Sequence, residues 1–236
     1  MPLIPSILPL PFMEGPADPQ QRVEAICASL YRLAPFRPSG VVCLTGPAGD
    51  LDEDRAREIV VDGLATISAE AEHAGVRMGL EPINRDVAEP PTIIGSIPEA
   101  VELVEEVDQP ALGIQFDTWN LWSTKSLLED IERECHRFVG VHVADFREPT
   151  RSWADRVLPG DGVADLGTIL GALDRAGWDG FYDLEIFSDN GTFGDAWPDS
   201  LWNVPADEVV RQGKKAFTRV WEARIREPLA QVRKER

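Results

Sequence analysis

The chain has 236 residues, of which 43% are hydrophobic, and it carries a formal net charge of −18. This length is sufficient for one domain with a well-buried core, and no apolar run approaches the ~20 residues that a membrane span needs. Because nucleic-acid affinity rests on Lys and Arg side chains that neutralise phosphates, the acidity argues against nucleic acid and anionic membranes as partners.

Predicted strands and helices alternate along the whole chain. Extended runs are expected at residues 3–9, 39–46, 76–83, 112–119, 138–146 and 180–187. Helices are expected at about residues 19–33, 52–74, 96–107, 126–137, 165–176 and 205–225. Since no linker or low-complexity tract interrupts this order, the pattern predicts one α/β domain over residues 1–236.

Cysteine usage and the first residues bear on the compartment. Cys27, Cys43 and Cys135 are too few and too scattered for a disulfide framework, which fits a reducing environment. The apolar opening contains four prolines and lacks a positively charged leader, so we expect no signal peptide. Together these features predict a cytoplasmic protein.

Four residues of metal-ligand type stand at the tails of four successive strand-like runs, namely Glu81, Asp117, His142 and Glu185. Side chains two apart share one face of a strand, and the tails of parallel strands point to one end of a barrel. Three carboxylates with one imidazole suit Mn²⁺, our first expectation, and also Mg²⁺ or Co²⁺, better than a structural zinc site. The pattern predicts one shared metal site.

Each of these residues also has a structural interpretation. Glu81 precedes a proline and can simply terminate a strand facing solvent, and His142 among valines can be a satisfied core histidine. Asp117 can cap the turn that follows it. The metal hypothesis rests on the four occurring at the same position of consecutive units.

Several segments together resemble the xylose isomerase-like TIM barrels, in particular their sugar-phosphate isomerase and epimerase group. They are LEPINRD, FDTWNLW, VHVADFRE, the run from PGDG at residue 159 to Phe187, and the terminal amphipathic helix. The similarity covers roughly residues 20–225, and it implies the same four metal ligands. It also implies eight strand-helix units, whereas six are visible, so the first two units of the barrel are expected to be missing.

The resemblance further implies substrate-binding positions. Arg147 matches the arginine of the family's HxxDxR segment. Asn120 stands where the family commonly has a histidine, and an amide cannot shuttle a proton near pH 7. Trp119 and Trp153 are candidate walls of a sugar pocket. Solvation of Arg147 and loop packing of the two tryptophans are the structural alternatives.

For chemistry, the resemblance implies proton transfer through a metal-bound enediolate, with Glu81 and Glu185 as the catalytic carboxylates and Asp117 and His142 holding the ion. The expected substrate is a keto-sugar or related polyol, and a homo-oligomer is common among such proteins. A metal-dependent dehydratase or lyase and a catalytically inactive truncated barrel are the alternatives. An endonuclease is disfavoured, because the chain has three histidines and the wrong charge for DNA.

Overall fold

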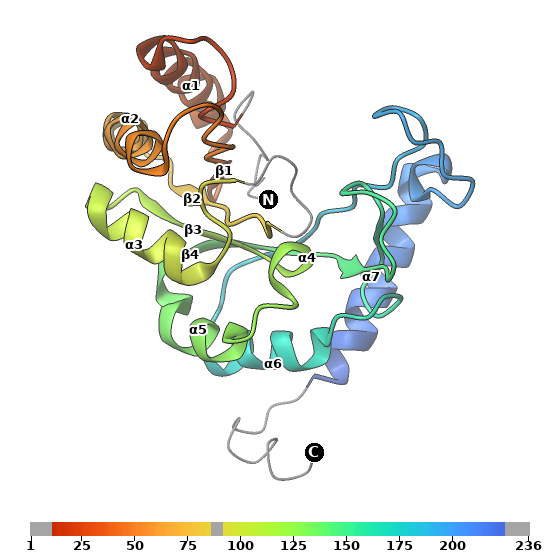
Figure 1. Ribbon diagram of the computed structural model, residues 1–236. Coiled ribbons are helices and arrows are strands. Elements are labelled where there is room, and N and C mark those ends of the chain that lie inside the picture. Colours follow the sequence, from red (N-terminus) through yellow and green to blue (C-terminus); the bar gives the residue numbers. More distant parts are fainter. Residues whose placement is uncertain (1–10, 86–91, 225–236) are drawn as a thin grey trace. The chain divides into compact units, whose positions relative to one another are not determined.

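A computed structural model describes residues 11–85 and 92–224 of the chain (Figure 1). The expected extended run at residues 3–9 lies outside these ranges. The chain divides into two compact units, which are described separately. Of the described residues, 11–85, 92–121 and 137–141 form the first unit, and 122–136 and 142–224 form the second.

The strands of the first unit follow the order of the sequence. β1 (Val41–Cys43), β2 (Met78–Leu80) and β3 (Leu112–Asp117) are fully buried and pair in parallel. β4 (Phe138–Val143) is next in the sheet order and continues into the second unit, where β7 (Tyr182–Leu184) follows it. Five of the six expected extended runs are thereby confirmed.

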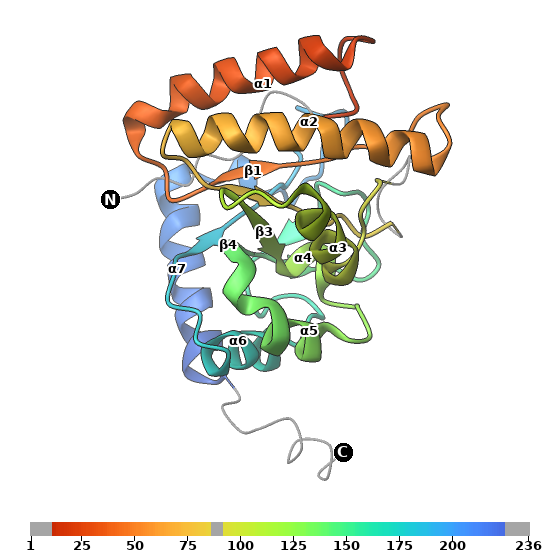
Figure 2. The same cartoon turned by 90° about the vertical axis from the view of Figure 1, so that its left-hand side faces the viewer.

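Helices of the first unit begin where the sequence supplies a capping side chain. α1 (Pro19–Leu33) and α2 (Glu53–His73) lie side by side in both views (Figure 2), and α3 (Ile97–Val107) follows β2 in the chain. The Asp18, Asp52 and Ser96 side chains accept hydrogen bonds from backbone N–H groups of the first turns. The 3₁₀ turn η1 (Ala34–Phe36) and the short helix α4 (Thr118–Leu121) were not expected.

The second unit contains α5 (Leu127–Glu134), α6 (Leu166–Arg175) and α7 (Ala206–Glu222), all within the predicted ranges. The 3₁₀ turns η2 (Cys135–Arg137) and η3 (Leu201–Asn203) extend or precede them. Two short strands, β5 (Asp145–Phe146) and β6 (Arg156–Val157), pair antiparallel within the loop after β4. In the described ranges, no helix is both long and apolar enough to cross a membrane.

Close backbone approach explains one glycine in β3. A Cβ atom on Gly113 would lie 2.4 Å from the carbonyl oxygen of Arg137 and 2.7 Å from Cγ2 of Val139. Gly113→Ala is therefore expected to lower the free energy of unfolding by about 1–3 kcal/mol, because the backbone must shift. Urea unfolding followed by circular dichroism measures the change.

The matched control is Gly167→Ala, where the nearest atom to the new Cβ would lie 3.9 Å away. This position is in the first turn of α6, so alanine is expected to be neutral or slightly stabilising. Equal stability of the two variants would contradict the close approach at Gly113.

Candidate metal and substrate site

In the first unit, two of the predicted ligands share one amide. Asn120 Nδ2 donates to Oε1 of Glu81 at 3.0 Å and to Oδ2 of Asp117 at 2.9 Å. All three side chains are buried, with exposed fractions of 5% or less. Asp117 Oδ1 also accepts a hydrogen bond from the backbone N of Trp119 at 2.8 Å. Asp117 therefore caps the turn that follows it, as expected, and also contacts Asn120.

This arrangement suits a cation. Two carboxylates buried within reach of the same amide nitrogen repel each other when both are ionised, and burial makes that repulsion stronger than in water. A divalent ion relieves the repulsion, and oxygen donors are the ligands that Mg²⁺ and Mn²⁺ prefer. Glu81 and Asp117 therefore have the chemistry of metal ligands, and Asn120 orients both.

A polar side chain lies two residues before Asp117 on the same strand. The neighbouring glycines make room for Gln115: a Cβ on Gly79 would lie 3.0 Å from Cβ of Gln115, and one on Gly140 would lie 2.5 Å from its Oε1. Gln115 is 1% exposed. Gly79 and Gly140 thus accommodate a buried amide two residues before Asp117 on its face of β3.

In the second unit, the other two predicted ligands are in contact. His142 Nδ1 lies 3.3 Å from Oε2 of Glu185, and Arg156 Nη1 donates to the same oxygen at 2.7 Å. Burial alone raises the pKa of Glu185, but the His142 hydrogen bond and the Arg156 guanidinium outweigh burial and lower this pKa to about 2. Glu185 is therefore a carboxylate at neutral pH.

Arg156 is a site residue that the sequence did not reveal. Its backbone N donates to the carbonyl oxygen of Phe187 at 2.9 Å, two residues after Glu185, and β6 also pairs Arg156 with Phe146 of β5. Arg156 is 6% exposed. The only signal in the sequence is its place just before the PGDG turn, and nothing in the strand and helix periodicity indicates that this loop forms a hairpin.

Asp145, the aspartate three residues after His142, binds the PGDG turn. Its carboxylate accepts backbone hydrogen bonds from Phe146 at 2.8 Å, Gly160 at 2.8 Å and Ala164 at 3.0 Å. A Cβ on Gly162 would lie 2.4 Å from Oδ1 of Asp145. The buried carboxylate thus ties the turn to the end of the ligand-bearing strand.

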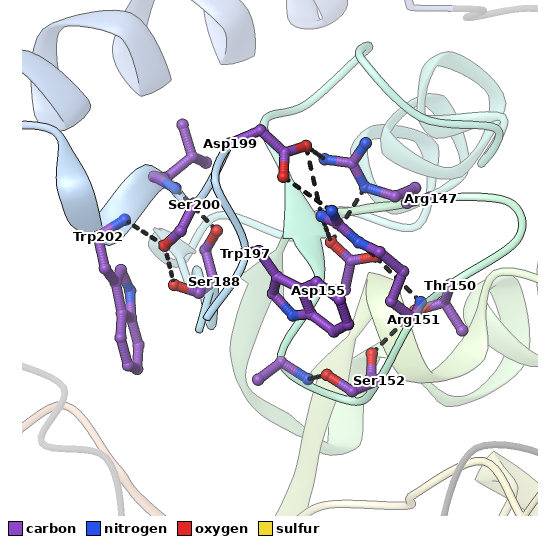
Figure 3. Close-up of polar contacts among 12 residues, drawn as sticks. Arg147, Thr150, Arg151, Ser152, Asp155, Ser188, Trp197, Asp199, Ser200 and Trp202 are labelled. Carbon is purple, nitrogen blue, oxygen red and sulfur yellow. Dashed lines mark hydrogen bonds and ion pairs between the residues drawn. The ribbon is translucent and has the colours of Figure 1, made fainter. Parts of the chain in front are cut away.

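The predicted substrate arginine Arg147 is engaged in an ion-pair network (Figure 3). Its Nε donates to Asp155 Oδ1 at 3.0 Å and its Nη2 lies 3.0 Å from Asp199 Oδ2. Arg151 binds the same two aspartates, with its Nη1 2.8 Å from Oδ1 of Asp199. Two arginines and two aspartates thereby neutralise one another, and substrate binding by Arg147 stays a prediction.

The network makes stability depend on pH. Burial raises the pKa of Asp155, but hydrogen bonds from Arg151 and the nearby Arg147 charge outweigh burial and lower it below its ordinary value. A lowered carboxyl pKa stabilises the fold above the unfolded-state pKa, and this stabilisation is lost as the pH falls through the folded-state pKa. The stability difference between wild type and Asp155→Asn should therefore shrink from about pH 6 to about pH 3.

Urea unfolding at several pH values measures this difference. Asp50→Asn, at an exposed position, serves as the control and should show a small difference at every pH. A difference for Asp155→Asn that grows on acidification would contradict the role of the arginines.

The two predicted tryptophans differ in exposure. Trp119 in α4 is 2% exposed, which favours the packing interpretation, whereas Trp153 is 46% exposed. Trp153 contacts Phe187 and Phe193, with ring centroids 5.2 Å and 4.8 Å away. Phe193 belongs to the loop after β7, and its contact with Trp153 was not predicted.

Comparison with known proteins identifies a family and several curated relatives. The model of the family described as xylose isomerase-like TIM barrel matches residues 7–219. An inosose isomerase of Bacillus subtilis (strain 168) is 24% identical over 167 residues, covering 69% of this chain and 55% of that protein. A 3-dehydroshikimate dehydratase of Pseudomonas putida is 29% identical over 159 residues, covering 63% of this chain and 23% of that protein.

A solved structure shows the same fold. The crystal structure of the IOLI protein with a binding zinc atom superposes with a TM-score of 0.72 at 20% sequence identity, over 92% of this chain and 75% of that one. The chain spans about half the length of the inosose isomerase that it matches.

Proposed function

Because the chain belongs to the xylose isomerase-like TIM barrel family, we propose that it is a divalent-metal-dependent isomerase or epimerase of a keto-sugar or related polyol. The observation that carries this proposal is the placement of Glu185, whose largely buried carboxylate lies 3.3 Å from Nδ1 of His142 and accepts a hydrogen bond from Arg156 at 2.7 Å. A carboxylate fixed beside a metal site is a group that can take up or return a proton at carbon. The relation to an inosose isomerase supports the reaction class.

The metal ligands in this proposal are Glu81, Asp117, His142 and Glu185, whose carboxylate and imidazole groups are of metal-ligand type. The prevalence of carboxylates among them favours Mn²⁺, with Mg²⁺ and Co²⁺ as alternatives. The zinc atom in the structurally similar IOLI protein supports a divalent ion at such a site. When bound, the ion polarises the carbonyl and hydroxyl oxygens of a keto-sugar.

The chain's own residues move the proton. Glu81 and Glu185 are the two catalytic carboxylates: one removes the proton from the carbon beside the carbonyl, and the other returns a proton to the neighbouring carbon or the opposite face. Epimerisation returns the proton to the opposite face of the same carbon. Isomerisation returns it to the former carbonyl carbon, and the proton of the neighbouring hydroxyl moves to the former carbonyl oxygen. Asp117 and His142 hold the ion.

Two further residues act on these carboxylates, one on their orientation and one on their ionisation. The Asn120 amide orients Glu81 and Asp117 by donating to both, and a group that fixes a ligand in this way contributes to metal affinity. The Arg156 guanidinium keeps Glu185 ionised. Substrate contacts by Asn120, Arg147, Trp119 and Trp153 remain part of the proposal.

The test has two steps on the same protein. The metal-stripped chain is first titrated with Mn²⁺ by calorimetry, and we expect one ion per chain. Ketohexoses and keto-cyclitols are then incubated in D₂O with the loaded protein, and deuterium at the carbon beside the carbonyl is followed by NMR. A folded chain that binds no divalent ion would refute the proposal.

A dehydratase is the second candidate, and the relation to the 3-dehydroshikimate dehydratase favours it. In that reaction the second carboxylic acid protonates a leaving hydroxyl, so water is lost and the substrate mass falls by that of one water molecule. Mass spectrometry of the same incubations separates the two candidates, because isomerisation leaves the mass unchanged apart from deuterium.

A further inference from the structure

Four aromatic side chains of the second unit form a contiguous group, which we term the aromatic platform: Trp153, Phe187, Phe193 and Trp202. Trp153 and Phe193 are 46% and 52% exposed, and their ring centroids lie 4.8 Å apart at an angle of 49°. Phe193 also lies 5.6 Å from Trp202. The platform thus presents two adjoining aromatic surfaces to solvent.

One side chain joins this platform to the proposed catalytic carboxylate. The Arg156 guanidinium lies 4.9 Å from the centroid of Phe187, and its Nη1 donates to Glu185 at 2.7 Å. Phe187 follows Glu185 by two residues in the chain. The exposed rings are thus connected to Glu185 through Phe187 and Arg156.

The segments that carry the exposed rings are held in place by buried acidic side chains. Asp189 accepts backbone hydrogen bonds from Gly191 at 3.1 Å, Phe193 at 3.0 Å and Asp195 at 2.8 Å. On the other segment, Asp155 accepts from the backbone N of Arg151 at 3.0 Å. Rings fixed in this way lose little conformational entropy when a ligand binds, which favours a role in recognition.

The charges nearby favour an uncharged ligand. Arg147 and Arg151 flank Trp153 in the sequence, but both are paired with Asp155 and Asp199, as Figure 3 shows. The Arg151 guanidinium also stacks on Trp197, 4.4 Å from the ring centroid. These arginines are therefore already neutralised, and a phosphate group would meet no unpaired cation from them.

The exposed surface is small for a protein partner. Two half-exposed aromatic side chains offer about 200 Å², whereas a stable interface buries about 800 Å² on each side. A six-membered ring matches this size. Its axial C–H groups form an apolar face that packs on aromatic rings, and a closed ring loses less conformational entropy than an open chain does.

We propose that the aromatic platform binds an uncharged closed ring, a pyranose or a cyclitol, through the exposed faces of Trp153 and Phe193. The proposal rests on the proposed function, because it names the substrate class of that site. It adds Phe193 as a specificity-determining residue. The group that is recognised is a ring that carries no phosphate at the end lying on the platform.

The test is saturation-transfer NMR on the full chain, with methyl β-D-glucopyranoside and myo-inositol as ring probes and sorbitol as the open-chain probe. Both ring probes should bind more tightly than sorbitol. Trp153→Ala and Phe193→Ala should each weaken ring binding by roughly 3- to 10-fold and leave sorbitol unchanged. Phe181→Ala is the matched control, since Phe181 is 49% exposed and precedes β7.

Ring binding that is unchanged in both platform variants, or sorbitol binding as tight as that of the rings, overturns the proposal. The proposal is also overturned if light scattering shows a dimeric wild type and both variants as monomers, because the platform then contacts a second copy of this chain. Circular dichroism confirms that each variant is folded.

The two proposals fail separately. If wild type binds the rings through the platform but exchanges no proton in any keto-sugar, the proposed function fails and the ring site stands. If exchange proceeds while the platform variants bind rings normally, only the ring site is overturned.

Discussion

Glu185→Gln is expected to weaken Mn²⁺ binding by at least about 100-fold, as measured by calorimetric titration of the metal-stripped chain. Loss of a metal ligand should exceed the roughly 10- to 100-fold effect of losing a residue that only orients one. The substitution removes the negative charge that lies 2.7 Å from the Arg156 guanidinium, so a buried cation is left beside the site. Proton exchange in keto-sugars should fall by about 10²- to 10⁴-fold.

Glu132→Gln is the matched control for this prediction. Glu132 also binds an arginine, Arg175 at 3.1 Å, but its side chain is 38% exposed and the pair is expected to contribute little. Metal affinity and exchange should stay at the wild-type level in this variant. If Glu185→Gln bound Mn²⁺ as tightly as Glu132→Gln does, Glu185 would not be a metal ligand.

Asp145→Ala is expected to lower the free energy of unfolding by roughly 2–5 kcal/mol, measured by urea unfolding. The fully buried carboxylate accepts from the backbone N–H groups of Phe146, Gly160 and Ala164, and alanine leaves these donors without it. Asp145→Asn should cost less, because the amide oxygen can replace one of the two acceptor oxygens.

The control for Asp145 lies in the same turn. Asp161 is exposed and pairs with Arg219 at 3.1 Å, so Asp161→Ala should cost no more than about 1 kcal/mol. Asp145→Ala is also expected to reduce proton exchange, because the turn that it holds follows Arg156 in the chain. An equal loss of stability in Asp145→Ala and Asp161→Ala would contradict the role assigned to the buried carboxylate.

Local features determined the helices. Asp52, Ser96 and Asp165 each precede an amphipathic run, and each side chain caps the helix that follows. Such a cap depends only on residues two or three positions away, so the sequence alone contains all the information that it needs. The extended runs expected at residues 112–119 and 138–146 likewise contain β3 and β4, because extended backbone is a local property of the chain.

The ligand candidates were also accessible from the sequence. Glu81, Asp117, His142 and Glu185 occupy equivalent places at strand ends, and the structure puts Glu81 with Asp117 and His142 with Glu185 inside their respective units. The pattern could not indicate Asn120 as the amide shared by two carboxylates. That contact needs α4, a four-residue helix too short to show a period of its own.

The sequence by itself determined the order of strands and helices, their caps and the four candidate metal ligands, since each follows from neighbours in the chain. Only the tertiary structure decided that Arg156 contacts Glu185, that Arg147 pairs with Asp155 and Asp199, and that Trp153 meets Phe193. These contacts join loop residues far apart in sequence. Loops have no periodicity, so their side-chain partners are decided by where the folded chain brings them together.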